Sequence, residues 1–126
     1  MRIADIHPLF RSMRFRKEIA EDLKPLKTLG ANRKHLDIAK RGLAYFSQGE
    51  WGSIVLGLEI LFRDTKKITP DHVANFINCI YDFKKLKLFN IENVISLARA
   101  QAKAINQNKS PNEIRKNFVN HWKAKG

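Results

Sequence analysis

Side chains suited to binding phosphate and nucleobases gather near the end of the chain, between residues 109 and 123. Cationic groups pair with phosphate oxygens, and carboxamides form hydrogen bonds with phosphates and with base edges. The residues expected to do so here are Lys109, Asn112, Arg115, Lys116, Asn120 and Lys123. A second set of cations lies mostly off the apolar face of an earlier helical segment and comprises Arg33, Lys34, Lys40 and Arg41. Both sets predict a surface that binds a polyanion.

The turn before the last helical segment supports this placement. Residues 110–113, Ser-Pro-Asn-Glu, form a capping box with proline at the first helical position. Residues 105–115 therefore resemble the turn and second-helix start of a helix-turn-helix, whose second helix reads the DNA major groove. The resemblance implies that Asn112 and Arg115 face the nucleic acid. Gln107 and Lys109 stand where that motif usually has apolar residues, so a structural hairpin with a basic outer face is the alternative.

Arg115 and His121 suggest a second resemblance. Their spacing is similar to the Arg-x(4–6)-His motif of HEPN-family ribonucleases, which implies a helical fold in which the Arg and the His cleave RNA, usually at a dimer interface. Two residues six positions apart on a regular helix point in different directions. Arg2 and His7 satisfy the same pattern by chance. A HEPN-like ribonuclease is therefore kept as a remote alternative.

Other groups that carry out chemistry are sparse in this sequence. The single cysteine, Cys79, lies in an apolar helical pattern, so we expect it to be at least partly buried and to form no internal disulfide. The four histidines, His7, His35, His72 and His121, lack the spacing of zinc ligands. There is no glycine-rich phosphate loop, no nucleophile elbow and no close carboxylate pair followed by a metal ligand. We expect no metal, no cofactor and no catalytic residue, and hence no enzyme.

The positive charge is unevenly distributed along the chain. The net charge is +12, of which residues 1–41 carry +6, residues 42–82 carry −2 and residues 83–126 carry +8. Repulsion among like charges opposes compactness, and a polyanionic partner is the simplest reason to tolerate it. If the two basic ends fold side by side, they form one positive face, as expected of a nucleic-acid-binding protein. The alternative is that these lysines are only solvated helix surface.

Prolines, glycines and capping residues divide the chain into helical segments. Pro8 and Pro25 are expected to bracket the first segment, with Gly30 as its exit. A second helix is predicted to start near Asn32 and to end or kink at Gly49. Its apolar face is formed by Leu36, Ala39, Leu43 and Phe46.

The remaining segments also follow helical spacing. Residues 51–62 are apolar nearly all round, which is typical of a central helix. Residues 69–71, Thr-Pro-Asp, begin the next helix, and Asn90 is expected to cap the one after it. Most aromatic side chains lie on apolar stripes and are assigned to the core. The exceptions, for which stacking on unpaired bases is an alternative to core packing, are Tyr45, Tyr81 and, as a weaker candidate, Trp51.

These patterns predict an all-α protein, a single compact bundle of five or six helices with short connections that spans residues 1–126 as one domain. We see no internal repeat. The start of the chain lacks the apolar core of a signal peptide, and residues 54–62 are too short to span a bilayer, so we expect a cytoplasmic, intracellular protein without membrane contact.

The function expected from the sequence is non-enzymatic binding of nucleic acid, DNA or RNA, by a regulator or accessory factor. The alternative is a protein-interaction module, an inhibitor or assembly factor, whose basic faces dock an acidic partner. The oligomeric state is left open.

Overall fold

The computed structural model describes residues 13–122, with side chains from residue 18 onward, and this part of the chain consists of helices and short connections. The helices are α1 Met13–Thr28, α2 Arg33–Leu43, α3 Gln48–Asp64, α4 Pro70–Lys85, α5 Ile91–Asn106 and α6 Pro111–Trp122. The predicted all-α class is confirmed, and the six helices within residues 13–122 agree with the predicted five or six.

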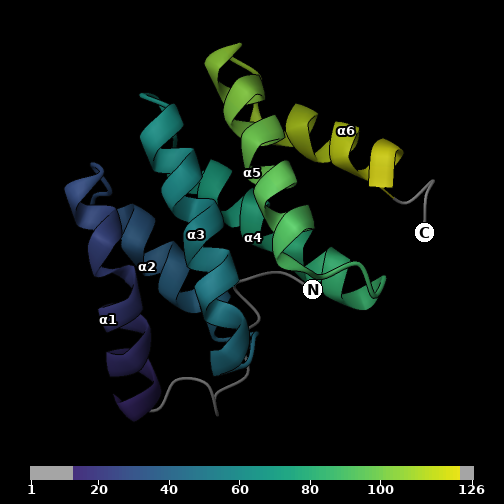
Figure 1. Ribbon diagram of the computed structural model, residues 1–126. Helices are drawn as coiled ribbons and strands as arrows, with labels where there is room; N and C mark the ends of the chain where they lie inside the picture. The colour runs from purple at the N-terminus through teal and green to yellow at the C-terminus, as the bar shows by residue number, and fades with distance from the viewer. Residues whose placement is uncertain (1–12, 123–126) are drawn as a thin grey trace.

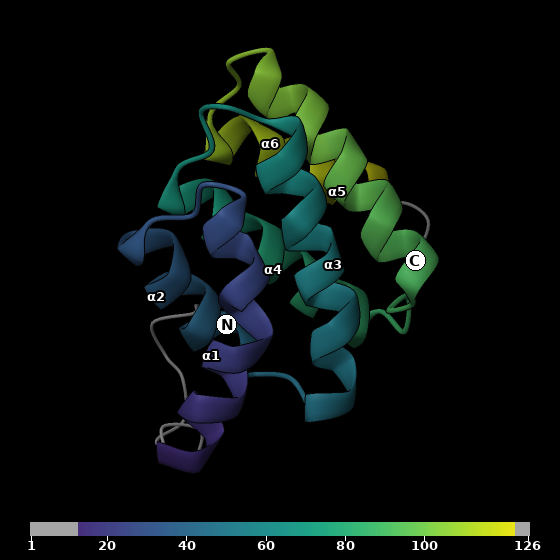
Figure 2. The ribbon, with the colours of Figure 1, turned by 60° about the vertical axis from the view of Figure 1, so that its left-hand side comes forward.

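The helices form hairpins that stack in two layers (Figure 1, Figure 2). Helices α1, α3 and α5 make one layer, and helices α2, α4 and α6 make the other. The two most extensive contacts join helices two positions apart in the chain, α3 with α5 and α2 with α4. Helix α1 packs against both α3 and α2, and α6 packs against α4. The helices therefore stack hairpin on hairpin in a compact bundle, although the sequence shows no repeat.

The predicted capping residues begin the helices where expected. The side chains of Asn32, Thr69 and Asn90 accept hydrogen bonds from the backbone N–H groups three residues later, at 3.0, 3.2 and 2.8 Å. Ser110 Oγ accepts from the Glu113 N–H at 3.2 Å. Each bond satisfies one of the backbone donors left without a partner at a helix start.

Left-handed residues end three of the helices. Gly30, Lys87 and Asn108 have φ angles of 100°, 61° and 64°. The residue after each donates to a carbonyl five positions earlier, closing the helix end in the same way; the bonds are Ala31 to Leu26, Leu88 to Phe83 and Lys109 to Ala104. The prediction that the first helical segment ends at Gly30 agrees with this left-handed conformation, which glycine adopts readily because it lacks a Cβ.

The prediction that Pro25 ends the first helix was wrong, because Pro25 lies inside α1. Proline lacks the N–H that would bond to the carbonyl four residues earlier. Only this one backbone hydrogen bond is lost, and α1 continues for just three more residues, to Thr28. Leu23 and Leu26, both 1% exposed, hold this last turn against the core.

The prediction for Gly49 was also wrong. Helix α2 ends at Leu43, and Gly49 lies in the first turn of α3, which is capped by Ser47 and Glu50. The Glu50 carboxylate accepts from the Ser47 N–H at 2.9 Å. This reciprocal capping overrides the weak helix propensity of glycine.

Helix α3 lies at the centre of the fold, as its apolar surface predicts, and Trp51, Ile54, Leu58 and Leu61 are fully buried. Trp51, which the sequence left as a candidate for exposure, donates from its indole to the carbonyls of Leu43 at 2.9 Å and of Phe46 at 3.2 Å. It therefore fastens α3 to the end of α2 and is not available for base stacking.

Two glycines let α4 approach both of its neighbours. A Cβ on Gly57 of α3 would lie 2.6 Å from Cζ of Phe76, and a Cβ on Gly42 of α2 would lie 2.7 Å from Cγ2 of Ile77. Because real Cβ atoms do not come this close to other heavy atoms, both positions require glycine at the present helix spacing.

His35 connects the first hairpin to the second. It occupies the third position of α2, where Nδ1 accepts from the Asn32 N–H at 3.0 Å. Its Nε2 lies 2.9 Å from the carbonyl oxygen of Ile68. Because a carbonyl only accepts, Nε2 carries the proton.

His72 repeats this arrangement one hairpin later. It occupies the third position of α4, Nδ1 accepts from the Thr69 N–H at 3.1 Å, and Nε2 donates to the carbonyl of Lys109 at 3.2 Å. Ile68 directly precedes Thr69, the N-cap residue of α4, and Lys109 directly precedes Ser110, which caps α6. The same device thus sets the position of α4 on α2 and of α6 on α4.

Candidate nucleic-acid interface

The two predicted sets of cations lie in the same layer of helices. The first set is on α2, and most of the second is on or just before α6. Helix α4 separates them, so they share a layer without lying side by side (Figure 2). Lys123 lies outside the described residues.

The cations of α2 point to two sides of the helix. Arg33 and Lys40 line a hollow between α1 and α2 together with Leu23 and Leu36. Lys34 and Arg41 are exposed and seven residues apart, which places them two turns apart on one side of the helix. Only this second pair faces away from α1.

Two tyrosines bring the end of α2 into contact with α4. Tyr45, just after α2, and Tyr81 of α4 are half-buried, and their ring centroids lie 5.8 Å apart at an interplanar angle of 65°. The Nζ atom of Lys85 lies 5.5 Å from the Tyr81 ring centroid. Partly exposed aromatic rings beside cations are the groups on which unpaired bases stack.

Lys85 was not among the residues predicted from the sequence. Lys85 follows Tyr81 by four residues, which places both on one side of α4. This spacing is the feature of the sequence from which Lys85 could have been predicted. The preceding Lys84 is used within the protein: its Nζ lies 2.9 Å from Glu50 Oε1 and 5.6 Å from the centroid of Phe46. Partial burial acts to raise the pKa of Glu50, but hydrogen bonds from Lys84 and Ser47 outweigh it and hold that pKa below its usual value.

Arg115, which we expected to face outward, is directed at α4 instead. Its Nη2 pairs with Asp82 Oδ2, and its Nη1 lies 3.3 Å from Cys79 Sγ. Asp82 is 8% exposed, so its carboxylate requires a partner of this kind. Burial raises the pKa of the Cys79 thiol to about 11 in spite of the nearby guanidinium, and this cysteine is buried as expected.

The other predicted residues near α6 are divided as well. Asn112, Lys116 and Asn120 are exposed and spaced by four, which aligns them along one side of the helix. Lys109 is half-buried, and its carbonyl is the acceptor for His72. The exposed row lies in the same layer as Lys34 and Arg41.

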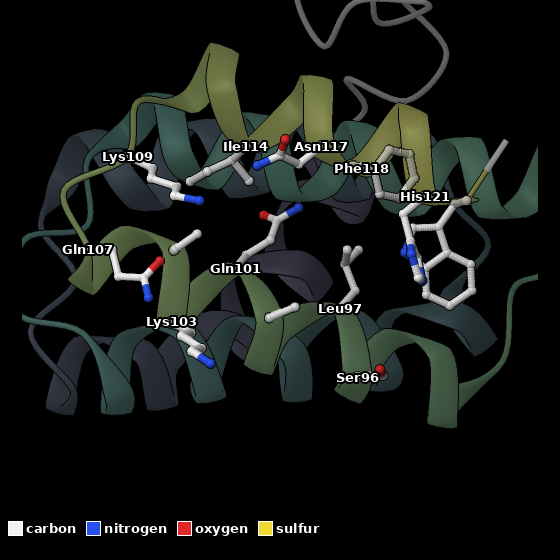
Figure 3. A pocket seen from close by; sticks show the side chains of 13 residues that line it. Ser96, Leu97, Gln101, Lys103, Gln107, Lys109, Ile114, Asn117, Phe118 and His121 are labelled. Atoms are coloured by element: carbon white, nitrogen blue, oxygen red, sulfur yellow. The ribbon is translucent and has the colours of Figure 1, made fainter. Parts of the chain in front are cut away.

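The turn predicted from the helix-turn-helix resemblance is present between α5 and α6, with Asn108 left-handed. Helix α6 packs on α4, and a groove separates it from much of α5 (Figure 3). His121 lines this groove, whereas Arg115 lines a different pocket, between α4 and α6. The pair that resembles the HEPN motif is therefore not assembled into one site within this chain.

Within residues 13–122, no three His, Cys, Asp or Glu side chains are grouped closely enough to hold a metal ion. None of the helices in that range is both long and apolar enough to cross a membrane. No protein-family model, curated protein or solved structure matches the chain.

Proposed function

We propose that this protein binds nucleic acid as a non-enzymatic regulator or accessory factor, through the exposed side of the layer formed by α2, α4 and α6. The observation that carries the proposal is the contact between the half-buried rings of Tyr45 and Tyr81, with Lys85 above one ring, in a layer that also exposes Lys34 and Arg41. Cations would hold phosphates, and the tyrosines would stack on unpaired bases.

The charges of the two layers favour this side. Helices α2, α4 and α6 together carry eight basic and four acidic residues, whereas α1, α3 and α5 carry eight basic and seven acidic residues. The contrast is largest between α2, with four basic residues and one acidic residue, and α3, with one basic and three acidic residues. A polyanion approaching the protein is therefore attracted to α2 and repelled by α3.

The role of the last helix differs from the one expected from the sequence. Arg115 is engaged with Asp82, so we assign it to structure. Lys116 with Asn112 and Asn120 are the groups of α6 that remain on the exposed side of the layer. They extend the proposed surface beyond α4 and add phosphate contacts for a longer strand.

The test is a fluorescence-anisotropy titration with labelled single-stranded DNA, RNA and duplex DNA over a range of salt concentrations. We expect binding that weakens as salt rises, because each neutralised phosphate releases counterions. No binding to any of the three at low salt would refute the proposal.

The surface is tested with two variants of equal charge. Replacing Lys34 and Arg41 by Gln should weaken binding and flatten the slope of log affinity against log salt by about 1.5, as two phosphate contacts are lost. Replacing Arg63 and Arg99, which are exposed on α3 and α5 of the other layer, by Gln should leave the slope nearly unchanged. Equal effects would assign binding to overall charge alone and reject the surface.

A further inference from the structure

The end of the helix stack carries an apolar groove between α5 and α6 (Figure 3). Its volume is about 330 Å³. The apolar lining comes from both helices and includes Leu97, Ala100, Ala104, Ile114, Phe118 and Trp122. Ala100 is exposed and Trp122 is half-buried, so apolar surface is open to solvent here.

The corresponding position one hairpin earlier is filled by a helix. Helix α5 packs extensively against α3 and also contacts α4. The hairpin of α5 and α6 is attached to its predecessor by the His72 bond, just as the previous hairpin is attached by the His35 bond. The groove between α5 and α6 therefore has the position that a helix occupies in a stack of this kind, and within residues 13–122 no helix occupies it.

The polar residues of the groove define the charge of its occupant. Lys103 and Lys109 line it together with His121, and none of the lining residues is Asp or Glu. Lys103 is exposed on α5, at the edge that an incoming helix would pass. A second copy of this chain fits poorly, because its net charge of +12 would be repelled.

We propose that this groove docks an acidic amphipathic helix of a partner protein. The apolar stripe of that helix packs on Ala100, Ala104 and Trp122, above a floor formed by the buried Leu97 and Phe118. Its carboxylates face Lys103 and Lys109. This is helix-in-groove recognition, in which apolar anchors supply affinity and charges select the partner. None of the groove's lining residues belongs to the surface proposed for nucleic acid, since Asn112, Lys116 and Asn120 of α6 do not line it, and the proposal therefore stands independently of nucleic-acid binding.

The probe is a labelled helical peptide with leucines at positions i, i+3, i+4 and i+7 and glutamates on both flanks of that stripe. We expect it to bind the full chain and to shift the emission of Trp122 to shorter wavelength, while the fully buried Trp51 contributes a constant background. Lys103→Glu should weaken binding about tenfold. Arg99→Glu is the matched control, since Arg99 is exposed on the same helix but does not line the groove, and it should change affinity by less than about twofold.

Two results would overturn the proposal directly. One is equal weakening by Lys103→Glu and Arg99→Glu in variants whose circular dichroism shows intact helices. The other is undiminished binding of a control peptide in which serines replace the leucines, because that peptide retains only the charge attraction.

Other occupants give different outcomes, and each would reject a partner helix. A concentration-dependent dimer, seen by sedimentation and abolished by Ala100→Glu, would assign the groove to a second copy. Peptide binding that requires deletion of residues 1–12 would assign it to that segment of the chain. Failure of the peptide to bind at low salt would contradict the proposal that an acidic helix docks in the groove.

Discussion

His72 donates a hydrogen bond from Nε2 to the carbonyl oxygen of Lys109, at 3.2 Å, while its Nδ1 accepts from the N–H of Thr69. One ring thus caps α4 and positions α6. We predict that His72→Ala lowers the free energy of unfolding by about 2 kcal/mol, since it leaves two backbone groups without partners. Urea denaturation measures the loss. His121→Ala, at an exposed position, should cost less than about 0.5 kcal/mol, and equal losses would contradict the assigned role.

Gly57 and Gly52 lie on the same helix and should respond to alanine with opposite signs. A Cβ at Gly57 would meet Phe76 at 2.6 Å and Val94 at 3.0 Å, whereas a Cβ at Gly52 meets nothing within 4 Å. We expect Gly57→Ala to destabilise by about 1–3 kcal/mol through overpacking. Gly52→Ala should stabilise by about 0.5–1 kcal/mol, because alanine favours the helix. Thermal denaturation of both variants tests the close packing of α3 and α4.

Arg115 and Lys116 are neighbours with different assigned roles. Arg115→Ala removes the nearer cation from the buried Asp82 carboxylate and leaves only Lys85, whose Nζ lies 3.9 Å from Oδ1. It should destabilise the fold by about 1–2 kcal/mol, a value below that of a fully buried pair because Lys85 remains and the Arg115 side chain is 34% exposed. Lys116→Ala should leave stability unchanged but weaken nucleic-acid binding. Adding Asp82→Asn to Arg115→Ala should recover part of the lost stability, and no recovery would argue against the ion pair as the cause.

The Tyr45 and Tyr81 rings are expected to contribute stacking and no charge. Replacing both by Leu should weaken binding of single-stranded nucleic acid about tenfold or more. The salt slope should not change, because no phosphate contact is lost. Tyr81→Phe keeps the ring and should bind like the original chain. Loss of binding in that variant would point to the hydroxyl group and not to stacking.

Burial raises the pKa of the Cys79 thiol to about 11, which has a consequence for stability at high pH. Below pH 9 the thiol is protonated in the folded and unfolded chains alike. Between pH 9 and 11 the unfolded chain loses the proton first, so the free energy of unfolding falls as pH rises, by at most about 3 kcal/mol. Cys79→Val should lack this component in urea titrations across that range. Rapid alkylation of native Cys79 at pH 8 would contradict the raised pKa.

Local signals in the sequence determined where most helices begin and which faces they bury. Asn32, Thr69 and Asn90 cap helices through hydrogen bonds to residues three positions away. Contacts between residues this close in the chain can be predicted from the sequence alone. The continuous apolar run of α3 likewise required a central position. The same local reasoning failed at Pro25, which lies inside α1, because the packing of Leu23 and Leu26 outweighs one missing backbone hydrogen bond.

Only the tertiary structure decided which side chains meet. Arg115 and Asp82 are 33 positions apart, and no local pattern reveals that they pair. The same is true of the contact between Tyr45 and Tyr81, of the groove between α5 and α6, and of the stacking that repeats without a repeated sequence. The sequence of a helix shows which of its faces is apolar and which is charged. It does not show which other helix the apolar face packs against, because burial is favourable against any complementary surface. The positive charge was therefore visible from the sequence, whereas the side of the molecule that presents it was set by the packing of the two layers.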